Sequence, residues 1–332
     1  MKNNEETIIF NELPLTEVFI PTRLLFREGQ VQELVRCLKP ALKNKSIQNV
    51  FLVGESGTGK TTTGRWVLES NFKRISVYVN CWKYKTTHEV LKEILLSFQV
   101  PVHGREPTGE LVKKLEKLLE KKRIIVFLDE VDQLKDFDVL YILARNNCGL
   151  VLASTRFYAL VDLPTRIKSS LALTEIEFPK YTWEELFEIL KDRIKFSMRP
   201  NSIKDELIKV ASIAAEGDAR IALEIIRRSA KKAESKGLMK ITIEEIREAI
   251  KETRKMRFNL VTSRLNKNQR IIFEILQVAK EMDSGELYRE YCHRVENPLG
   301  RRAYRKNMEK LVKLGLVEAS GFGRWRRYKI PW

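Results

Sequence analysis

The stretch NVFLVGESGTGKTTTGRWVLE, residues 49–69, decides the fold. An apolar run, Val50–Val53, precedes a glycine-rich turn, and a segment typical of a helix follows the turn. The turn runs from Gly54 to Thr61 and fits the pattern GxxxxGK followed by Ser or Thr without exception. In this context the glycines let backbone N–H groups converge on phosphate oxygens, and the helix N-terminus adds partial positive charge. The sequence therefore predicts a phosphate-binding loop.

The residues of this loop have separate expected roles. Lys60 would reach the β- and γ-phosphates of a nucleotide, and the Thr61 hydroxyl would ligate Mg²⁺. We therefore expect ATP or ADP as the ligand, with Mg²⁺. The predicted nucleotide contacts from this stretch are Gly54, Glu55, Ser56, Gly57, Thr58, Gly59, Lys60, Thr61 and Thr62.

A second apolar run, IIVFLDE at 124–130, ends in two acids. Asp129, at the end of a strand, would lie beside the loop and hold Mg²⁺ through water. Glu130 is suited to orient or deprotonate the attacking water. The pair predicts an ATPase that hydrolyses as well as binds, and the alternative interpretation is an acidic loop after a strand.

The rest of the N-terminal half alternates strands and helices. A β-rich run at 75–80 predicts a second strand, and the run at 149–155 is apolar without polar alternation, which is typical of parallel strands covered on both faces. Amphipathic segments at 86–98 and 108–122 predict helices, each opened by a Thr that can cap it. Together these elements predict an α/β core with a parallel sheet.

After Pro179 the pattern of strands stops. Residues 181–253 read as helices only, with Gly217-Asp218 as a break before one of them and Thr242 to Glu245 as a capping box. The last part predicts a helix at 267–282, a shorter one at 286–293, and a basic helix from Pro298 to about Leu314 that precedes a hairpin.

Positive charge is concentrated at the C-terminal end of the chain. The 332 residues carry a formal net charge of +17, of which residues 254–332 hold +11, with 19 Lys and Arg against 8 Asp and Glu. A concentrated basic domain indicates a polyanion partner, because each neutralised phosphate releases counterions. A solvated lysine-rich surface is the alternative.

Composition also indicates where the protein works. No apolar run reaches the roughly 20 residues that a membrane helix needs, and the start MKNNEETIIF lacks the features of a secretory signal. Four widely spaced cysteines favour neither a metal site nor disulfides. We expect a cytoplasmic, nucleoid-associated protein with reduced thiols and no membrane partner.

Three further stretches resemble boxes of the archaeal origin-recognition initiators, AAA+ ATPases related to eukaryotic origin-recognition subunits and to the helicase-loading ATPase. GDARIALEIIRRSAKKAES (217–235) resembles their second sensor. LPTRIKSSLALTEIEFPKYTWEELFEIL (163–190) resembles the segment that joins core and lid, and FIPTRLLFREGQVQEL (19–34) resembles the adenine-side segment. The resemblance implies an AAA+ nucleotide-binding core at 1–180, an all-α lid with the second sensor at 181–256, and a winged-helix DNA-binding domain at 257–332.

The resemblance also implies roles for single residues. Arg220 would be the second sensor and face the γ-phosphate, whereas an exposed helix-face arginine is the alternative. Arg166 matches the arginine-finger position, which completes a neighbouring subunit's site. Arg27 and Glu28 lie in the adenine-side segment. Thr155 stands where the family usually has Asn as the first sensor, and its shorter reach puts the rate of hydrolysis in doubt more than binding.

The basic C-terminal helix and hairpin predict a winged helix-turn-helix. A helical wheel gives Ala303, Leu311, Leu314 and either Met308 or Val312 as the apolar face. The N-terminal residues of such a helix lie near base edges in the major groove, and the hairpin would be the wing. The alternative for this domain is a winged helix that docks on protein. The stretch between Asp129 and the next strand matches a region where the family has a DNA-contacting helix, and for Arg145 in this stretch the alternative is a simple surface helix. The predicted DNA contacts are Arg301, Arg302, Arg305, Lys306, Arg324, Trp325, Arg326, Arg327 and Arg145.

Two functions fit this sequence. The first is an ATP-binding, slowly hydrolysing initiator that recognises double-stranded origin DNA and helps recruit the replicative helicase, with other copies or paralogues as further partners. The second is an ATP-regulated transcription regulator, or a divergent non-initiating paralogue, on the same scaffold. A rapid ring-forming motor or clamp-loader-like ATPase is disfavoured by the single winged helix and by the family boxes.

Overall fold

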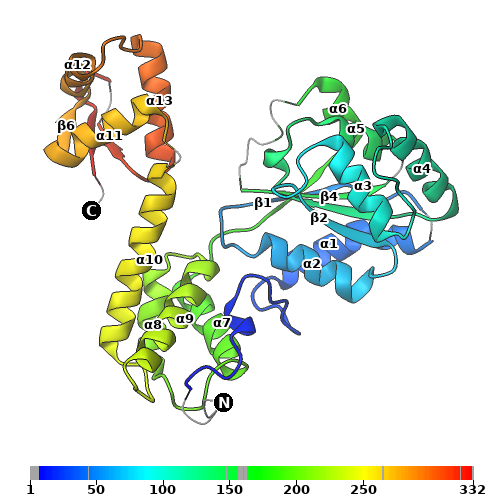
Figure 1. The fold of residues 1–332 in the computed structure, drawn as a ribbon, viewed down its shortest axis with the longest axis horizontal. Coiled ribbons are helices and arrows are strands. Elements are labelled where there is room, and N and C mark those ends of the chain that lie inside the picture. The colour runs from blue at the N-terminus through cyan, green and yellow to red at the C-terminus, as the bar shows by residue number, and fades with distance from the viewer. Residues whose placement is uncertain are drawn as a thin grey trace. The chain divides into compact units, whose positions relative to one another are not determined.

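The chain divides into two compact units, Met1–Ile250 and Lys251–Trp332 (Figure 1). The computed structural model describes residues 7–43, 45–146, 148–155, 160, 163–263, 265–321 and 323–330, without the side chains of residues 257, 260, 313 and 324. The first unit contains a parallel sheet and a group of helices, and the second contains helices and a small antiparallel sheet.

A parallel sheet organises the first unit. Within the described residues it has five strands in the order β2-β3-β4-β1-β5. The strands are β1 (Val50–Val53), β2 (Ser76–Asn80), β3 (Ile125–Asp129), β4 (Gly149–Ser154) and β5 (Thr174–Glu177). Every residue of β1, β3 and β4 is buried, which confirms the prediction of strands covered on both faces. The sequence did not predict β5, because this short strand is mostly polar and has no apolar run, with Ile176 as its one buried residue.

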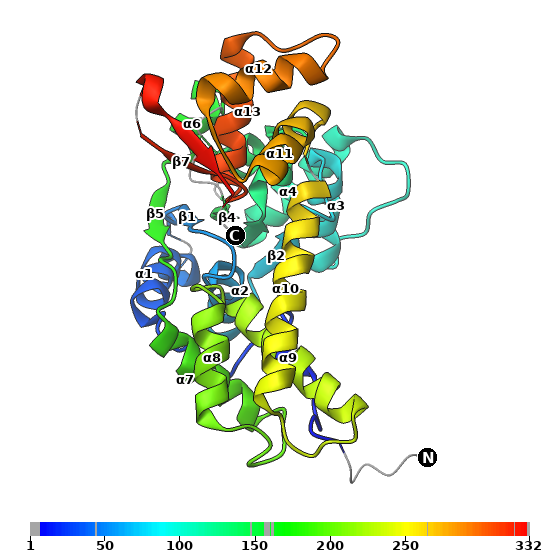
Figure 2. The ribbon, with the colours of Figure 1, turned by 90° about the vertical axis from the view of Figure 1, so that its left-hand side faces the viewer.

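Helices cover both faces of the sheet (Figures 1 and 2). One face packs against α1 (Glu28–Leu38) and α2 (Lys60–Asn71). The other face packs against α3 (Thr87–Ser97), α4 (Thr108–Lys121), α5 (Asp138–Arg145) and α6 (Thr165–Leu171). Successive residues of β1 alternate between the two clusters, as the pleat of a strand requires. Short 3-10 turns lie at η1 (Leu13–Leu15), η2 (Lys39–Lys43) and η3 (Val131–Gln133).

The two predicted threonine caps in this core have different outcomes. Thr86 caps α3 in a full capping box with Glu89, as predicted. The prediction for α4 was wrong, because Thr108 is its first helical residue and the cap position belongs to Pro107, whose carbonyl accepts from the N–H groups of Glu110 and Leu111. A prolyl residue with extended ψ can begin a helix in this way without a side-chain cap.

A helical group follows the sheet, in agreement with the expectation of helices only. It contains α7 (Trp183–Lys195), α8 (Asp205–Ala214), α9 (Ala219–Ser235) and the start of α10 (Ile243–Ser263). Its core also takes in the N-terminal segment, since Ile8 and Leu15 are buried among these helices. The Phe10 N–H donates to the Ser197 carbonyl at 3.0 Å. The N-terminal segment therefore packs with the helical group before it reaches the sheet.

The second unit is small and basic. It contains α11 (Lys267–Ala279), β6 (Glu281–Asp283), α12 (Ser284–Arg294), α13 (Arg301–Lys313), β7 (Glu318–Ser320), η4 (Gly323–Trp325) and β8 (Arg327–Lys329). The strands pair antiparallel in the order β6-β8-β7. The helix predicted to reach residue 282 ends at Ala279, because Lys280 has φ +65° and Met282 pairs with Tyr328 instead.

The apolar face predicted for α13 was partly wrong. Ala303 is exposed and Leu314 is 38% exposed, whereas Tyr304, Met308 and Leu311 are buried at helical spacing. The predicted apolar face is rotated away from the observed one, because the prediction includes the small Ala303 and omits the larger Tyr304. The helix also begins at Arg301 and not at Pro298, with Gly300 as its N-cap residue. In the hairpin, Tyr328 and Ile330 are buried, and Trp325 lies in η4, before β8.

The cysteines of this fold are free thiols. Cys37, Cys81 and Cys148 are buried and Cys292 is partly buried. In the described parts of both units, no helix combines the length and the apolar character that crossing a membrane requires.

Candidate functional site

The loop between β1 and α2 has the shape that the sequence motif predicts. Gly57 and Gly59 have φ of +72° and +92°, which glycine adopts without strain. There is also no room for a side chain, since a Cβ at Gly57 would lie 1.9 Å from Asp218 Oδ1 and one at Gly59 would lie 2.5 Å from the Tyr181 hydroxyl. Both the backbone conformation and the packing therefore require glycine.

Lys60 begins α2 and points back over this loop. Its Nζ donates to the carbonyls of Gly54 and Glu55, both at 2.7 Å. The residue is 6% exposed, and its burial, with the charge of Arg220 as the next cause, lowers the pKa of Lys60 to about 8. Burial and the neighbouring cation disfavour the charged ammonium, so a polyanion that binds beside Lys60 would stabilise it.

Thr61 and Asp129 place two oxygen groups beside the loop. The Thr61 hydroxyl donates to Asp129 Oδ2 at 2.8 Å, and the Glu130 N–H donates to Asp129 Oδ1 at 3.1 Å. Hydroxyl and carboxylate oxygens are the ligands that Mg²⁺ prefers. Burial, followed by the neighbouring charge of Asp129, raises the pKa of Glu130 above its ordinary value. The donor set therefore fits a nucleotide-bound magnesium ion.

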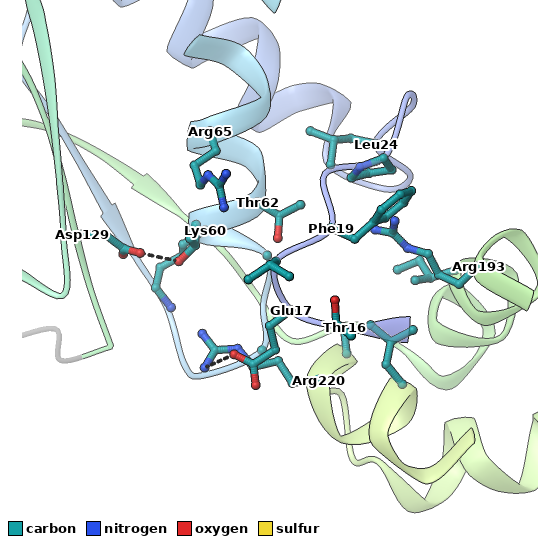
Figure 3. Close-up of a pocket in the computed structure, with 18 of the residues that line it drawn as sticks. Thr16, Glu17, Phe19, Leu24, Lys60, Thr62, Arg65, Asp129, Arg193 and Arg220 are labelled. Carbon is teal, nitrogen blue, oxygen red and sulfur yellow. Dashed lines mark hydrogen bonds and ion pairs between the residues drawn. The ribbon is translucent and has the colours of Figure 1, made fainter. Parts of the chain in front are cut away.

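These groups border one cleft of about 390 Å³ (Figure 3). Its walls come from the loop, from the end of β3, from α7 and α9, and from the N-terminal segment. Of the predicted nucleotide and catalytic residues, those that line it are Gly57, Gly59, Lys60, Thr61, Thr62, Asp129, Glu130 and Arg220. The phosphate loop and the two acids at the end of β3 thus meet the start of α9 at a single site.

The first turn of α9 lies directly on the phosphate loop. Asp218 caps the helix by accepting from the N–H groups of Arg220 at 2.9 Å and Ile221 at 3.2 Å. The Ala219 N–H donates to the Gly57 carbonyl at 3.1 Å. This geometry brings the Arg220 guanidinium to the cleft, where its Nη1 lies 3.7 Å from Glu17 Oε2.

The side of the cleft opposite the loop was only outlined by the sequence. The N-terminal segment supplies most of it, and Figure 3 shows the Phe19 ring beside the Arg193 side chain of α7. The Arg193 guanidinium lies 4.7 Å from the centroid of the Phe19 ring. The lining residues in this region are Thr16, Glu17, Val18, Phe19, Pro21, Arg23, Leu24, Leu25, Ile189, Asp192, Arg193 and Leu223. The stretch at 19–34 that resembles an adenine-side segment covers Phe19 to Leu25, and the other two family boxes cover Ile189 and Leu223. No motif marks the remaining residues, which meet only through the packing of the N-terminal segment on the helices.

Arg27 lies behind the loop and not in the cleft. It is 3% exposed, donates to the carbonyls of Thr58 at 3.0 Å and Pro179 at 2.7 Å, and stacks 3.7 Å from the Tyr181 ring centroid. Arg27 therefore ties the phosphate loop to the junction between sheet and helices. Its neighbour Glu28 begins α1 and, like Arg27, does not line the cleft.

Thr155 and Arg166 are also not among the residues that line the cleft. Thr155 follows Ser154, the last residue of β4, whose hydroxyl donates to Asp132 at 2.8 Å. Arg166 is in α6, where it lies 3.8 Å from Asp138 with its side chain 69% exposed. Both roles stay predictions.

The basic residues of the second unit are mostly on its surface. Arg301, Arg302, Arg305 and Lys306 are exposed on α13, and Arg326 is exposed before β8. Trp325 is 84% exposed. Arg327 is exposed but lies 2.9 Å from Asp283 and 3.4 Å from Glu281, and these carboxylates, Asp283 foremost, raise its pKa. The side chain of Arg324 and all of Phe322 lie outside the described residues.

Arg145 lies in the first unit, at the end of α5. Its Nη1 donates to the Tyr141 hydroxyl at 2.7 Å, one helical turn earlier. The guanidinium carbon lies 5.4 Å from the centroid of the same ring. The predicted DNA contact at Arg145 is therefore a side chain that already rests on its own helix.

Known proteins match both the sheet and the helical group. The family model of the AAA domain matches residues 44–158, and the model of the Cdc6 AAA+ ATPase-type lid domain matches residues 187–251. ORC1-type DNA replication protein 1 of Sulfurisphaera tokodaii is 34% identical over 300 residues, covering 82% of this chain and 75% of that protein. ORC1-type DNA replication protein 1 of Archaeoglobus fulgidus is 30% identical, covering 98% of this chain and 88% of that protein.

A solved structure extends the similarity over both units. The Aeropyrum pernix ORC1 protein, in complex with DNA, superposes with a TM-score of 0.73 and 26% identity, covering 97% of this chain and 93% of that one. The fold is thus a parallel α/β AAA+ core with an all-helical lid, as predicted. With relatives of at least 30% identity over most of its length, this chain belongs to the archaeal ORC1/Cdc6 family of DNA replication proteins.

Proposed function

We propose that this protein is an ATP-binding, slowly hydrolysing initiator that binds double-stranded DNA at a replication origin and helps recruit the replicative helicase. One observation carries the nucleotide part of the proposal. Lys60, Thr61, Asp129, Glu130 and Arg220 come from three separate stretches of the sequence and border the same cleft. The similar Aeropyrum pernix ORC1 protein in complex with DNA supports the DNA part.

The cleft residues have distinct proposed roles toward the nucleotide. The loop N–H groups and Lys60 would bind the phosphates, and Thr61 and Asp129 would hold Mg²⁺, which supplies charge stabilisation at the phosphoryl group. Glu130, at the end of the same strand as Asp129, would orient the attacking water and accept its proton. The raised pKa of Glu130 suits a group that takes up a proton.

Turnover would be slow and would act as a switch. The proposed first sensor, Thr155, has a shorter side chain than Asn, so its hydrogen bond to phosphate or water would be harder to form. Arg220 would bind the γ-phosphate from the lid and thereby couple the lid to the nucleotide state. Arg166 would complete the site of a neighbouring copy, because a surface arginine of this kind can reach across an interface.

We assign residues 1–180 to the AAA+ core, 181–256 to the lid, and 257–332 to a winged-helix domain. The helix and strand order of the last part supports the assignment, with α13 as the recognition helix and β7–β8 as the wing. Its exposed α13 cations would contact the phosphate backbone and base edges. The protein would act in the cytoplasm on the nucleoid, together with the helicase and with other copies or paralogues.

The experiment that tests this function is genome-wide footprinting in the source organism, combined with calorimetry of the purified protein. Occupancy at replication start sites, together with ADP and ATP binding that Mg²⁺ strengthens, is the expected result. Occupancy confined to promoters would instead favour the transcription-regulator alternative. Rapid DNA-stimulated multiple turnover would contradict the proposed switch and favour a motor.

A further inference from the structure

Tyr78 in β2 contacts the carboxylate of Asp129, the residue that would hold Mg²⁺ in the proposed function. Its hydroxyl donates to Asp129 Oδ2 at 3.0 Å, the same oxygen that accepts from the Thr61 hydroxyl at 2.8 Å. We infer that Tyr78 is a positioning residue for the magnesium site, which acts through Asp129 to keep the Thr61 hydroxyl directed for metal binding. The inference rests on the proposed nucleotide and Mg²⁺ binding and extends it to a residue outside the sequence motifs.

Asp129 is held at both of its oxygens. Oδ2 accepts from Thr61 and Tyr78, and Oδ1 accepts from the Glu130 N–H at 3.1 Å. The residue is 4% exposed, so water cannot freely replace a lost donor. Without the Tyr78 hydroxyl, the Asp129 carboxylate would rotate more freely about its Cβ–Cγ bond, because Thr61 would be the remaining side-chain donor among the described residues.

The Thr61 hydroxyl links this restraint to the metal. A hydroxyl has one proton to donate and two lone pairs to accept with. When its proton is given to Asp129, its lone pairs point elsewhere and are available to a cation. A carboxylate that turns away releases the Thr61 proton, and the hydroxyl can then rotate out of the orientation that a cation needs.

Tyr78 is itself fixed by its neighbours. The Asn80 side-chain amide donates to the Tyr78 hydroxyl at 3.4 Å, which leaves the hydroxyl proton for Asp129. The Tyr78 ring packs edge-on to Phe127 with centroids 5.3 Å apart, and the Arg65 guanidinium lies 5.2 Å from its centroid. Arg65 is one helical turn after Thr61 in α2. The ring is therefore held by apolar and cationic contacts, and the hydroxyl adds the bond to Asp129 and the weaker one from Asn80.

This division of contacts allows the hydroxyl to be tested separately from the ring. Tyr78→Phe keeps the packing against Phe127 and Arg65 and removes the hydroxyl that donates to Asp129 and accepts from Asn80. A tyrosine that only fills space between α2 and the sheet would leave metal binding unchanged in this variant. Tyr84→Phe is a matched control, because it removes a tyrosine hydroxyl six residues later whose ring lies under Lys83.

The experiment uses the full-length chain and two binding measurements. ADP affinity is measured by calorimetry in EDTA, and Mn²⁺ binding to the ADP-saturated protein is measured by electron paramagnetic resonance. For Tyr78→Phe we expect unchanged ADP affinity in EDTA and a loss of about tenfold in Mn²⁺ affinity, the range for removal of a group that supports a metal ligand. Tyr84→Phe should match the natural protein in both.

A second variant pair identifies the path of the effect. If Tyr78 acts through Asp129, then adding Tyr78→Phe to Asp129→Asn should weaken Mn²⁺ binding no further. Equal losses in the two backgrounds would overturn the inference, as would an unchanged Mn²⁺ affinity in Tyr78→Phe alone. Failure of the proposed function is a separate result: the natural protein would then bind neither ADP in EDTA nor Mn²⁺ with ADP.

Discussion

The Arg220 guanidinium in the first turn of α9 lies 3.7 Å from the Glu17 carboxylate, so an ion pair joins the lid to the N-terminal segment across the cleft. The dashed line in Figure 3 marks this pair. Both side chains are partly in solvent, at 39% and 66% exposure, and a pair of this kind contributes little to stability. The pair matters for nucleotide binding, because the Glu17 carboxylate competes with the γ-phosphate for Arg220, the residue that the proposed function assigns to that phosphate.

Removing the charge of Glu17 should therefore strengthen nucleotide binding. For Glu17→Gln we expect ATP affinity to rise by up to about fivefold, which corresponds to about 1 kcal/mol for an exposed ion pair. Calorimetry at low salt is the measurement. Glu33→Gln, which removes an exposed carboxylate from α1, is the control and should leave affinity unchanged. Equal or weaker binding by Glu17→Gln would show that the carboxylate does not compete.

Lys60 should dominate the affinity for phosphate. Lys60→Ala removes the buried cation over the loop, so we expect tight ATP binding to be abolished in the same calorimetric assay. Lys180→Ala is a matched control, since Lys180 lies beside the loop but pairs with Glu55 at 2.9 Å in solvent. Unchanged ATP affinity in Lys60→Ala would refute the proposed role.

The stability of the protein should fall at acidic pH because of Glu245, at the start of α10. Its carboxylate accepts from the Thr242 hydroxyl at 2.6 Å and from Lys236 at 2.9 Å, and these bonds lower the pKa of Glu245 to about 2. The folded state therefore favours the ionised form. The resulting stabilisation is complete above the ordinary pKa of 4.5 and is lost as the pH falls from there to about 2.

Glu245→Ala is the corresponding stability test. We expect the free energy of unfolding at pH 7 to fall by about 1–2 kcal/mol, as for loss of a helix cap. Chemical denaturation at pH 7 and pH 3 is the measurement, and the difference between variant and natural protein should shrink at the lower pH. Glu244→Ala, at the exposed neighbouring position, should have the smaller effect. A difference that is the same at both pH values would exclude the charged form of Glu245 as the cause.

The wing should contribute phosphate contacts unequally. Arg324→Ala combined with Arg326→Ala should weaken duplex DNA binding and reduce the slope of log affinity against log salt by about 0.9 for each lost phosphate contact. Arg327→Ala should change the slope less, because Asp283 and Glu281 already neutralise that guanidinium. Fluorescence anisotropy across a salt series measures both. An unchanged slope in the double variant would remove the wing from the interface.

The sequence was most informative where a motif and a strand coincide. Val50–Val53 and the run ending in Asp129 predicted two strands and both sides of the phosphate site, because buried parallel strands need continuous apolar residues. It was least informative where function depends on packing between distant segments. Glu17, Arg193 and Tyr78 lie outside the sequence motifs, and their place in the cleft follows only from the folded chain.

The error in α13 has a similar origin. A helical wheel ranks residues by apolarity, so it selected Ala303 and omitted Tyr304, although the ring of Tyr304 contributes far more buried area. Once Tyr304 is taken as an anchor, the exposed arginines on either side of it fall on the surface. The prediction that the basic residues of α13 are exposed is nevertheless correct, because charged side chains are seldom fully buried without partners.

The N-terminal segment has a mechanical consequence for the lid. Ile8 and Leu15 are anchored in the lid core, and the chain then passes along the cleft to α1, while a second connection runs through Phe178 to Tyr181. The helical group and the sheet are therefore joined by two lengths of chain, and the first of them carries Glu17, the ion-pair partner of Arg220. We expect any change in the position of α9 over the phosphate loop to require movement of this N-terminal segment as well.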